Sequence, residues 1–97
     1  MSYNGWTNYE TWAIKLWMDN HEGSYRHWLT RTKATVNAFD LGYRRDLADT
    51  RRLAEEIKAH HEAEARLEGF AGDLLGTALS RVDWREIAEN LLEDVGQ

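Results

Sequence analysis

Three side chains in the middle of the chain have the chemistry of metal ligands. His60, His61 and Glu64 lie close together, and on a helix His60 and Glu64 would stand one turn apart. A zinc site needs three or four ligands, but the other histidines, His21 and His27, are distant in the sequence and there is no cysteine. We therefore predict no metal and no other cofactor, and interpret these residues as the polar end of an exposed helix.

The sequence also contains little evidence for a catalytic nucleophile or for a catalytic acid–base pair. Neither Ser24 nor Ser80 lies in a nucleophile motif, and the glycines within residues 69–76 lack the preceding strand that a phosphate-binding loop needs. Adjacent acids such as Glu55 and Glu56 fall on faces that we expect to be solvated, where nothing tunes their pKa for catalysis. We therefore expect a protein that is not an enzyme.

The C-terminal stretch carries a row of carboxylates on one side of a predicted helix. These acids recur every one to four positions and comprise Glu86, Glu89, Glu93 and Asp94. Each step of three or four residues rises about 4.5–6 Å along a helix. That rise is of the same order as the spacing of about 3.4 Å between phosphates on one nucleic-acid strand. The row could engage a basic groove on a partner protein, and the opposing interpretation is an ordinary solvated face.

A second charged surface has the opposite sign. Four arginines in the middle of the chain could form a phosphate-binding patch, namely Arg44, Arg45, Arg51 and Arg52. Acids follow the last two arginines at a spacing of one helical turn, so an ion-paired solvated face is the simpler interpretation. The patch defines the alternative function, a small nucleic-acid-binding accessory or regulatory protein.

Composition limits both hypotheses. The formal net charge is −5, and residues 1–45 carry six basic and four acidic side chains (+2) against six and thirteen (−7) in residues 46–97. This balance argues against a general affinity for nucleic acid. No apolar run approaches the roughly 20 residues that span a membrane, no signal peptide is recognisable, and the lack of cysteine fits a reducing compartment. We expect a single cytoplasmic domain over residues 1–97.

The stretch from Trp6 to Trp17 is predicted to form the first helix. Thr7 and Glu10 stand at capping-box spacing, and the helix is expected to end near residues 20–23, where Gly23 supplies a permissive backbone. The apolar residues on one predicted face are Tyr9, Trp12, Ala13, Leu16 and Trp17. The polar strip that remains is narrow and contains Thr11, Lys15 and Asp19. A helix that is apolar over so much of its circumference is expected to be the buried centre of the fold.

Four further helical segments follow from the 3.6-residue periodicity. A second helix, capped by Ser24, has an inner face of Tyr25, Trp28, Leu29, Thr32, Val36 and Phe39. After a turn at residues 40–43, a third runs from residue 45 or 46 to 68, with Leu53 and Ile57 on its inner stripe. A short helix around Leu74 and a last one, capped by a box of Asp83 and Glu86, complete the chain. We predict an all-α fold, a small irregular bundle of four to five helices with antiparallel neighbours.

Two motifs at the chain ends are not forced by amphipathic patterning. They are Tyr3-Asn4-Gly5-Trp6-x-Asn8-Tyr9-Glu10-Thr11-Trp12-x-x-x-Leu16-Trp17 and Val82-Asp83-Trp84-Arg85-Glu86-Ile87-Ala88-Glu89-Asn90-Leu91-Leu92-Glu93-Asp94. Together they resemble a family of small proteins encoded largely by phages, plasmids and other mobile elements. The resemblance implies no catalytic residues. It implies a setting in which small acidic proteins bind and block host machinery, as anti-CRISPR proteins do.

These observations lead to one leading hypothesis and two alternatives. We expect a protein-binding inhibitor of a host defence complex, such as a CRISPR effector subunit, acting in the host cytoplasm without direct nucleic-acid or membrane contact. Its acidic face would bind the partner, with exposed aromatic side chains as anchors. The basic patch supports the nucleic-acid alternative, and self-association through the end of the third helix supports a homo-oligomer.

Overall fold

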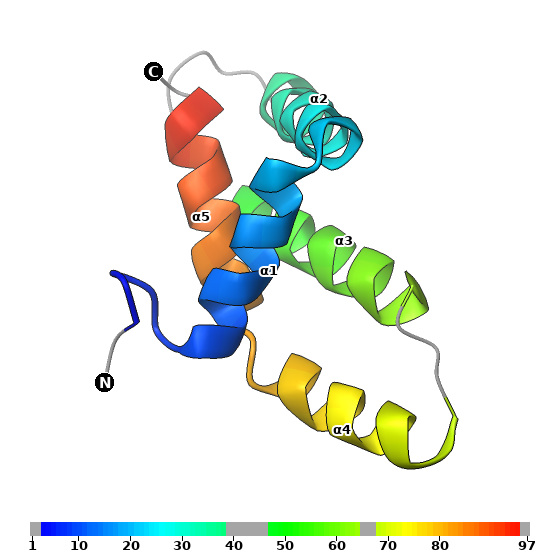
Figure 1. The fold of residues 1–97 in the computed structure, drawn as a ribbon. Coiled ribbons are helices and arrows are strands. Elements are labelled where there is room, and N and C mark those ends of the chain that lie inside the picture. Colours follow the sequence, from blue (N-terminus) through cyan, green and yellow to red (C-terminus); the bar gives the residue numbers. More distant parts are fainter. Residues whose placement is uncertain (1–2, 39–46, 65–67, 96–97) are drawn as a thin grey trace.

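A computed structural model describes residues 3–38, 47–64 and 68–95, which form five α-helices and no β-strand. The helices are α1 (Tyr9–Asn20), α2 (Glu22–Ala38), α3 (Leu47–Glu64), α4 (Gly69–Ser80) and α5 (Trp84–Val95), shown in Figure 1. The predicted all-α bundle of four to five helices is thereby confirmed. None of the described helices combines the length and apolar character needed to cross a bilayer. The turn predicted at residues 40–43 lies outside the described residues.

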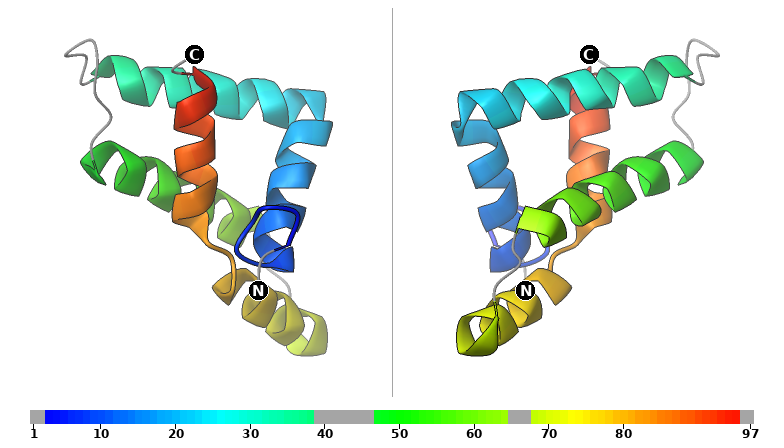
Figure 2. Two further views of the ribbon diagram at one scale, coloured as in Figure 1. Left: turned by 90° about the vertical axis from the view of Figure 1, so that its left-hand side faces the viewer. Right: turned by 90° about the vertical axis from the view of Figure 1, so that its right-hand side faces the viewer.

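The central helix is α5, which packs against α1, α2 and α3 (Figures 1 and 2). Its apolar side chains all fall on one side, and Ile87 and Ala88 are completely buried. Met18 of α1, Trp28 of α2 and Ile57 of α3 belong to the same core. The prediction that α1 would be the centre is wrong. α5 carries a single apolar stripe that faces the core, and this stripe orients the helix more strongly than the larger number of tryptophans orients α1.

α1 buries its polar strip and exposes its aromatic face. Thr11 is fully buried and Lys15 is 6% exposed, whereas Tyr9 and Trp17 are 54% and 64% exposed. Burying the strip is tolerable because its polar groups are bonded: the Lys15 ammonium lies 2.7 Å from both carboxylate oxygens of Asp19. The expectation that the aromatic face would be buried is therefore wrong.

α1 and α5 lie side by side and run in the same direction, while α2 crosses the far end of α1 (Figure 2). The corner between α1 and α2 is at His21, whose backbone is extended (φ −100°, ψ 114°). Gly23 and Ser24 lie within the first turn of α2. α1 ends at Asn20, within the predicted range of residues 20–23. The role predicted for Gly23 in stopping the helix, the cap at Ser24 and the antiparallel pairing of α1 and α2 are wrong, since one extended residue at His21 is enough to turn the chain.

The inner stripe of α3 is confirmed at Leu53 and Ile57, which are completely buried. None of the described residues of α3 after Ile57 is buried, but His61 is partly buried. Its ring centroid lies 6.1 Å from that of Trp28 and 5.6 Å from that of Trp84. The predicted polar end is therefore exposed at Glu62 and Glu64, whereas His61 packs on the core.

α4 is the least packed helix. It contains only one charged residue, Asp73, yet none of its residues is buried, and Phe70 is 80% exposed. Leu79, near its end, is the residue that touches the core cluster. The helix lies apart from the other four at the lower edge of the molecule in Figure 1.

Candidate functional site

The two end motifs meet in space and hold each other in place. The Asn8 side chain caps α1 by accepting a hydrogen bond from the Thr11 backbone (2.9 Å), and its amide donates to the Arg81 carbonyl (2.6 Å) just before α5. The Thr11 hydroxyl in turn accepts a hydrogen bond from the Asp83 backbone N–H (2.8 Å). Each helix therefore caps or orients the start of the other.

Further bonds of this junction involve Asp83 and Glu86, and the Thr7 hydroxyl donates to the Asp83 carboxylate (3.4 Å). Asp83 caps α5 by accepting from the Glu86 backbone (3.0 Å), as predicted. Glu86 does not complete the capping box, because its carboxylate accepts a hydrogen bond from the Thr7 backbone (2.9 Å). The predicted box of Thr7 and Glu10 is wrong, since Asn8 is the cap. Carboxylates gathered at two adjacent helix N-termini also complement the positive ends of both helix dipoles.

A tight turn precedes α1 and positions two aromatic rings. Tyr3 and Trp6 exchange two backbone hydrogen bonds (2.6 and 2.8 Å) around Asn4 and Gly5, which both have positive φ (50° and 89°). Positive φ at both central residues defines a type I′ turn. The turn places the Tyr3 ring against Tyr9 of α1 (centroids 5.3 Å apart) and leaves Trp6 beside α5.

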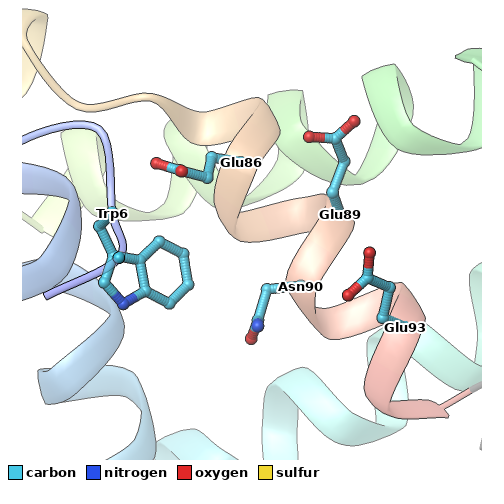
Figure 3. A pocket seen from close by; sticks show the side chains of 6 residues that line it. Trp6, Glu86, Glu89, Asn90 and Glu93 are labelled. Atoms are coloured by element: carbon cyan, nitrogen blue, oxygen red, sulfur yellow. The ribbon is translucent and has the colours of Figure 1, made fainter. Parts of the chain in front are cut away.

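Trp6 and α5 form the two sides of an open groove of about 340 Å³, which we term the Trp6 groove. Its lining residues are Gly5, Trp6, Glu86, Glu89, Asn90 and Glu93. Figure 3 shows that Glu86 and Asn90 extend toward the side of Trp6, while Glu89 and Glu93 form a second row one helical step away. Three of the four predicted partner-binding acids therefore share one groove, and Asp94 lies against a different, smaller cavity that Lys15 also lines.

The described residues that line the Trp6 groove carry only negative charge. Glu89 is half-exposed and has Arg85 at 3.7 Å, and Glu93 is exposed. None of the described lining residues is basic. An indole face beside carboxylates attracts a cation through both the ring quadrupole and the charges. The groove can therefore hold a lysine or arginine side chain.

A second surface adjoins the same turn, on the outside of α1. This α1 aromatic face consists of Tyr3, Tyr9, Trp12, Leu16 and Trp17. The rings of Tyr3, Tyr9 and Trp12 contact one another, with centroids 4.9–5.6 Å apart. Large aromatic side chains that are exposed but held by neighbours are typical anchors at protein interfaces. Sequence analysis missed the assembled face and the role of Trp6, although the Asn4-Gly5 dipeptide is a signal for a tight hairpin turn.

The predicted basic patch is only partly described. Arg44 and Arg45 lie outside the described residues, and Arg51 and Arg52 are exposed on α3. The nearby cation Arg31 of α2 is bonded to Glu56 of α3 (2.6 Å). This hydrogen bond, together with the negative charge of the carboxylate, raises the pKa of Arg31. The Arg31 side chain therefore links α2 to α3.

Two of the candidate metal ligands, His60 and Glu64, contact each other. His60 Nε2 lies 2.8 Å from a carboxylate oxygen of Glu64, and His61 Nδ1 lies 2.8 Å from the Ile57 carbonyl. Within residues 3–38, 47–64 and 68–95, no three histidine or acidic side chains are arranged to hold a metal ion. Burial lowers the pKa of His61, and the charge of His60 lowers it further, against the smaller opposing effect of its hydrogen bond to Ile57.

Comparison with known proteins identifies a family but no characterised relative. The chain belongs to a family of unknown function, DUF7249, whose model matches residues 1–94. That match includes both end motifs and all the helices between them. Neither a curated protein nor a solved structure matches the chain.

Proposed function

We propose that this chain is a non-enzymatic protein-binding module that takes a basic segment of a partner protein into the Trp6 groove. The observation that carries the proposal is the groove itself, which is lined by the indole of Trp6 and by three acidic side chains of α5. Glu86 lies on the side of Trp6, and Glu89 and Glu93 form the second row (Figure 3). Lysine and arginine side chains complement both features, since they bear a charge for the carboxylates and can stack on the ring.

The α1 aromatic face extends this surface with apolar contact area. The turn formed by residues 3–6 joins the two regions, because Tyr3 contacts the aromatic face and Trp6 lines the groove. Interfaces of this type combine aromatic anchors with charged groups that steer the partner and fix its orientation. The arrangement supports binding of a protein that presents basic side chains next to an apolar patch.

The biological setting that we propose is inhibition of a host defence complex in the cytoplasm. Its support is the resemblance of the end motifs to proteins of phages and other mobile elements. Proteins that handle nucleic acid expose basic grooves, and the acidic groove would compete for such a surface. A CRISPR effector subunit is the concrete partner that we propose on this basis.

The test is affinity capture from host lysate, with nuclease added, using wild type and two charge-reversal variants. Glu89→Lys/Glu93→Lys changes the Trp6 groove but keeps Glu86, whose carboxylate bonds Thr7. Glu55→Lys/Glu62→Lys makes the same change in net charge at exposed positions of α3. We expect a basic partner protein that is retained by wild type and the α3 variant and lost by the groove variant.

Two other outcomes would contradict the proposal. Equal loss of the partner in both variants would show that net charge matters and the groove does not. Recovery of nucleic acid, with an affinity that falls steeply as salt is added, would favour the alternative function through the arginines of α3. Circular dichroism of each variant establishes that the helices are intact.

A further inference from the structure

All four histidines of the chain contribute to one groove of about 580 Å³ on a different part of the molecule. It is lined by α1, the corner after it, α2 and the C-terminal end of α3. Its lining residues are Ile14, Trp17, Met18, His21, Gly23, Ser24, His27, Trp28, His60, His61 and Glu64. We term it the histidine groove. Its volume is within the range of about 300–1,000 Å³ that is usual for small-molecule sites.

Six flat rings line the histidine groove, and they are already arranged in contact. The rings of Trp17 and His21 are stacked, with an interplanar angle of 14° and centroids 4.5 Å apart. His27 and His60 form a second stacked pair across α2 and α3 (5.6 Å). Trp17 is 64% exposed, so most of its surface is available to a further ring. Such a lining favours a planar ligand that can stack.

The hydrogen-bonding groups of the groove are complementary to a nitrogen heterocycle. The Nδ1 atoms of His21 and His61 lie 3.1 and 2.8 Å from the carbonyls of Trp17 and Ile57. Because a carbonyl only accepts, each Nδ1 carries the proton, and each neutral ring keeps Nε2 as an acceptor. The indole N–H of Trp28 is buried and has no hydrogen-bond partner among the described residues, which is an unusual and costly state.

The charges in the groove discriminate among planar ligands. Among the described residues that line the groove, Glu64 is the one acid, and none is a lysine or an arginine. A phosphate group would therefore lie near a carboxylate, with no described side chain of permanent positive charge to offset it. An uncharged ligand avoids this repulsion.

We propose that the histidine groove binds an uncharged planar nitrogen heterocycle of the nucleobase class, stacked on Trp17. This site is separate from the Trp6 groove and does not depend on the function proposed there. The heterocycle could come from a free nucleoside or from an unstacked base of a single strand, because both present the same ring. The lack of basic lining residues favours the nucleoside.

The test is a titration of the ¹⁵N-labelled chain with adenosine, adenosine monophosphate and a short deoxyadenosine oligonucleotide, followed by amide and indole NMR signals. We expect adenosine to shift the Trp28 indole signal and the amide signals of the histidine groove, and to bind more tightly than the monophosphate. Trp17→Ala should weaken adenosine binding by about tenfold, as stacking on an exposed aromatic ring does. Tyr9→Ala, an exposed aromatic outside the groove, should leave it unchanged.

The source of the base follows from the same titration. Oligonucleotide binding that is tighter than adenosine binding, with the same signals shifted and the same loss in Trp17→Ala, would keep the ligand class and assign a single strand as its source. The proposal is overturned if millimolar adenosine and the oligonucleotide leave the groove signals unchanged, or if Trp17→Ala and Tyr9→Ala bind equally well. Trp17 is largely exposed, so its replacement tests binding without removing a core residue.

Discussion

α1 and α5 begin at the same junction and run in the same direction, yet they turn opposite kinds of face inward. α5 buries an apolar stripe that contains Ile87, Leu91 and Leu92. α1 buries Thr11, Lys15 and Met18, and keeps most of its aromatic residues outside. In α5 the loss of apolar surface from water is sufficient to explain the orientation. In α1 the hydrogen bonds of Asn8 and Thr11 to the start of α5 hold the helix in its observed rotation.

This difference between α1 and α5 separates residues that stabilise the fold from residues that are available for binding. Hydrogen bonds at the junction fix which side of α1 faces α5, so its aromatic residues are not needed to fill the core. Tyr9 and Trp17 remain largely exposed, and Trp17 lines the histidine groove. Trp6, in the turn before α1, is partly buried against the core and lines the Trp6 groove. Exposed aromatic side chains in such number are unusual unless they bind something.

The largest expected effect is the loss of a core side chain of α5. Ile87→Ala removes three methyl or methylene groups from a completely buried position, and we expect the free energy of unfolding to fall by about 2–5 kcal/mol. Urea denaturation followed by circular dichroism measures this change. Leu16→Ala on α1, the matched control at a partly exposed position, should cost much less. Equal losses in the two variants would mean that α1 and α5 contribute to the core alike.

Thr11→Val tests directly whether hydrogen bonds or apolar burial orient α1, because it makes the buried strip of α1 more apolar. The Thr11 hydroxyl donates to the Asn8 side chain (2.7 Å) and accepts from the Asp83 backbone. Valine has the same shape but leaves the buried Asp83 N–H without its partner, so we expect a loss of about 1–3 kcal/mol in the same denaturation assay.

The control for this substitution is Thr30→Val at an exposed position of α2, which should change stability by less than about 0.5 kcal/mol. If Thr11→Val were instead stabilising, apolar burial and not hydrogen bonding would orient α1.

The sequence was sufficient to predict the helices but not the rotation of α1. Periodicity located the inner stripe of α3 at Leu53 and Ile57. It also located the start of α5 at Asp83, where the apolar residues and the cap agree. In α1 these two signals disagree. Its apolar residues cover most of the circumference, so burial could not choose a side, and the deciding bonds join residues more than seventy positions apart.

The candidate sites were predictable to a similar, partial extent. The acidic residues of α5 were identified from their helical spacing, and three of the four line one groove. Trp6 was not assigned to that groove, because its place depends on the turn at Asn4 and Gly5 and on the parallel packing of α1 and α5. The histidine groove was missed for the same reason: its histidines lie on three segments, and only tertiary structure brings His21 and His27 to the end of α3.

A smaller effect is expected from the protonation of His61. Burial lowers its pKa in the folded chain, whereas in the unfolded chain the ordinary value of about 6.5 applies. Between these two values the unfolded chain binds more protons, so stability should be constant above pH 6.5 or so and fall as the pH drops through this window. The neighbouring charges are His60, which lowers the pKa, and Glu64, which raises it.

His61→Phe keeps a ring between Trp28 and Trp84 but cannot be protonated. We expect the difference in stability between this variant and wild type to change with pH below about 6.5 and to be constant above it. Denaturation curves at a series of pH values measure this difference. A constant difference over the whole range would show that His61 has the same pKa in the folded and unfolded chain.

The smallest effect on stability is expected on the α1 aromatic face, where it distinguishes binding from packing. Leu16 lies on the outer side of α1 and is 39% exposed. Leu16→Gln introduces an unbranched polar side chain and keeps a good helix propensity, so the free energy of unfolding should change by less than about 0.5 kcal/mol. If this face contacts the partner proposed for the Trp6 groove, the same variant should weaken partner binding, by about tenfold if Leu16 is one of the anchors. Unchanged binding together with a clear loss of stability would place Leu16 in the core, and the contrast between α1 and α5 would then be smaller than the exposed rings indicate.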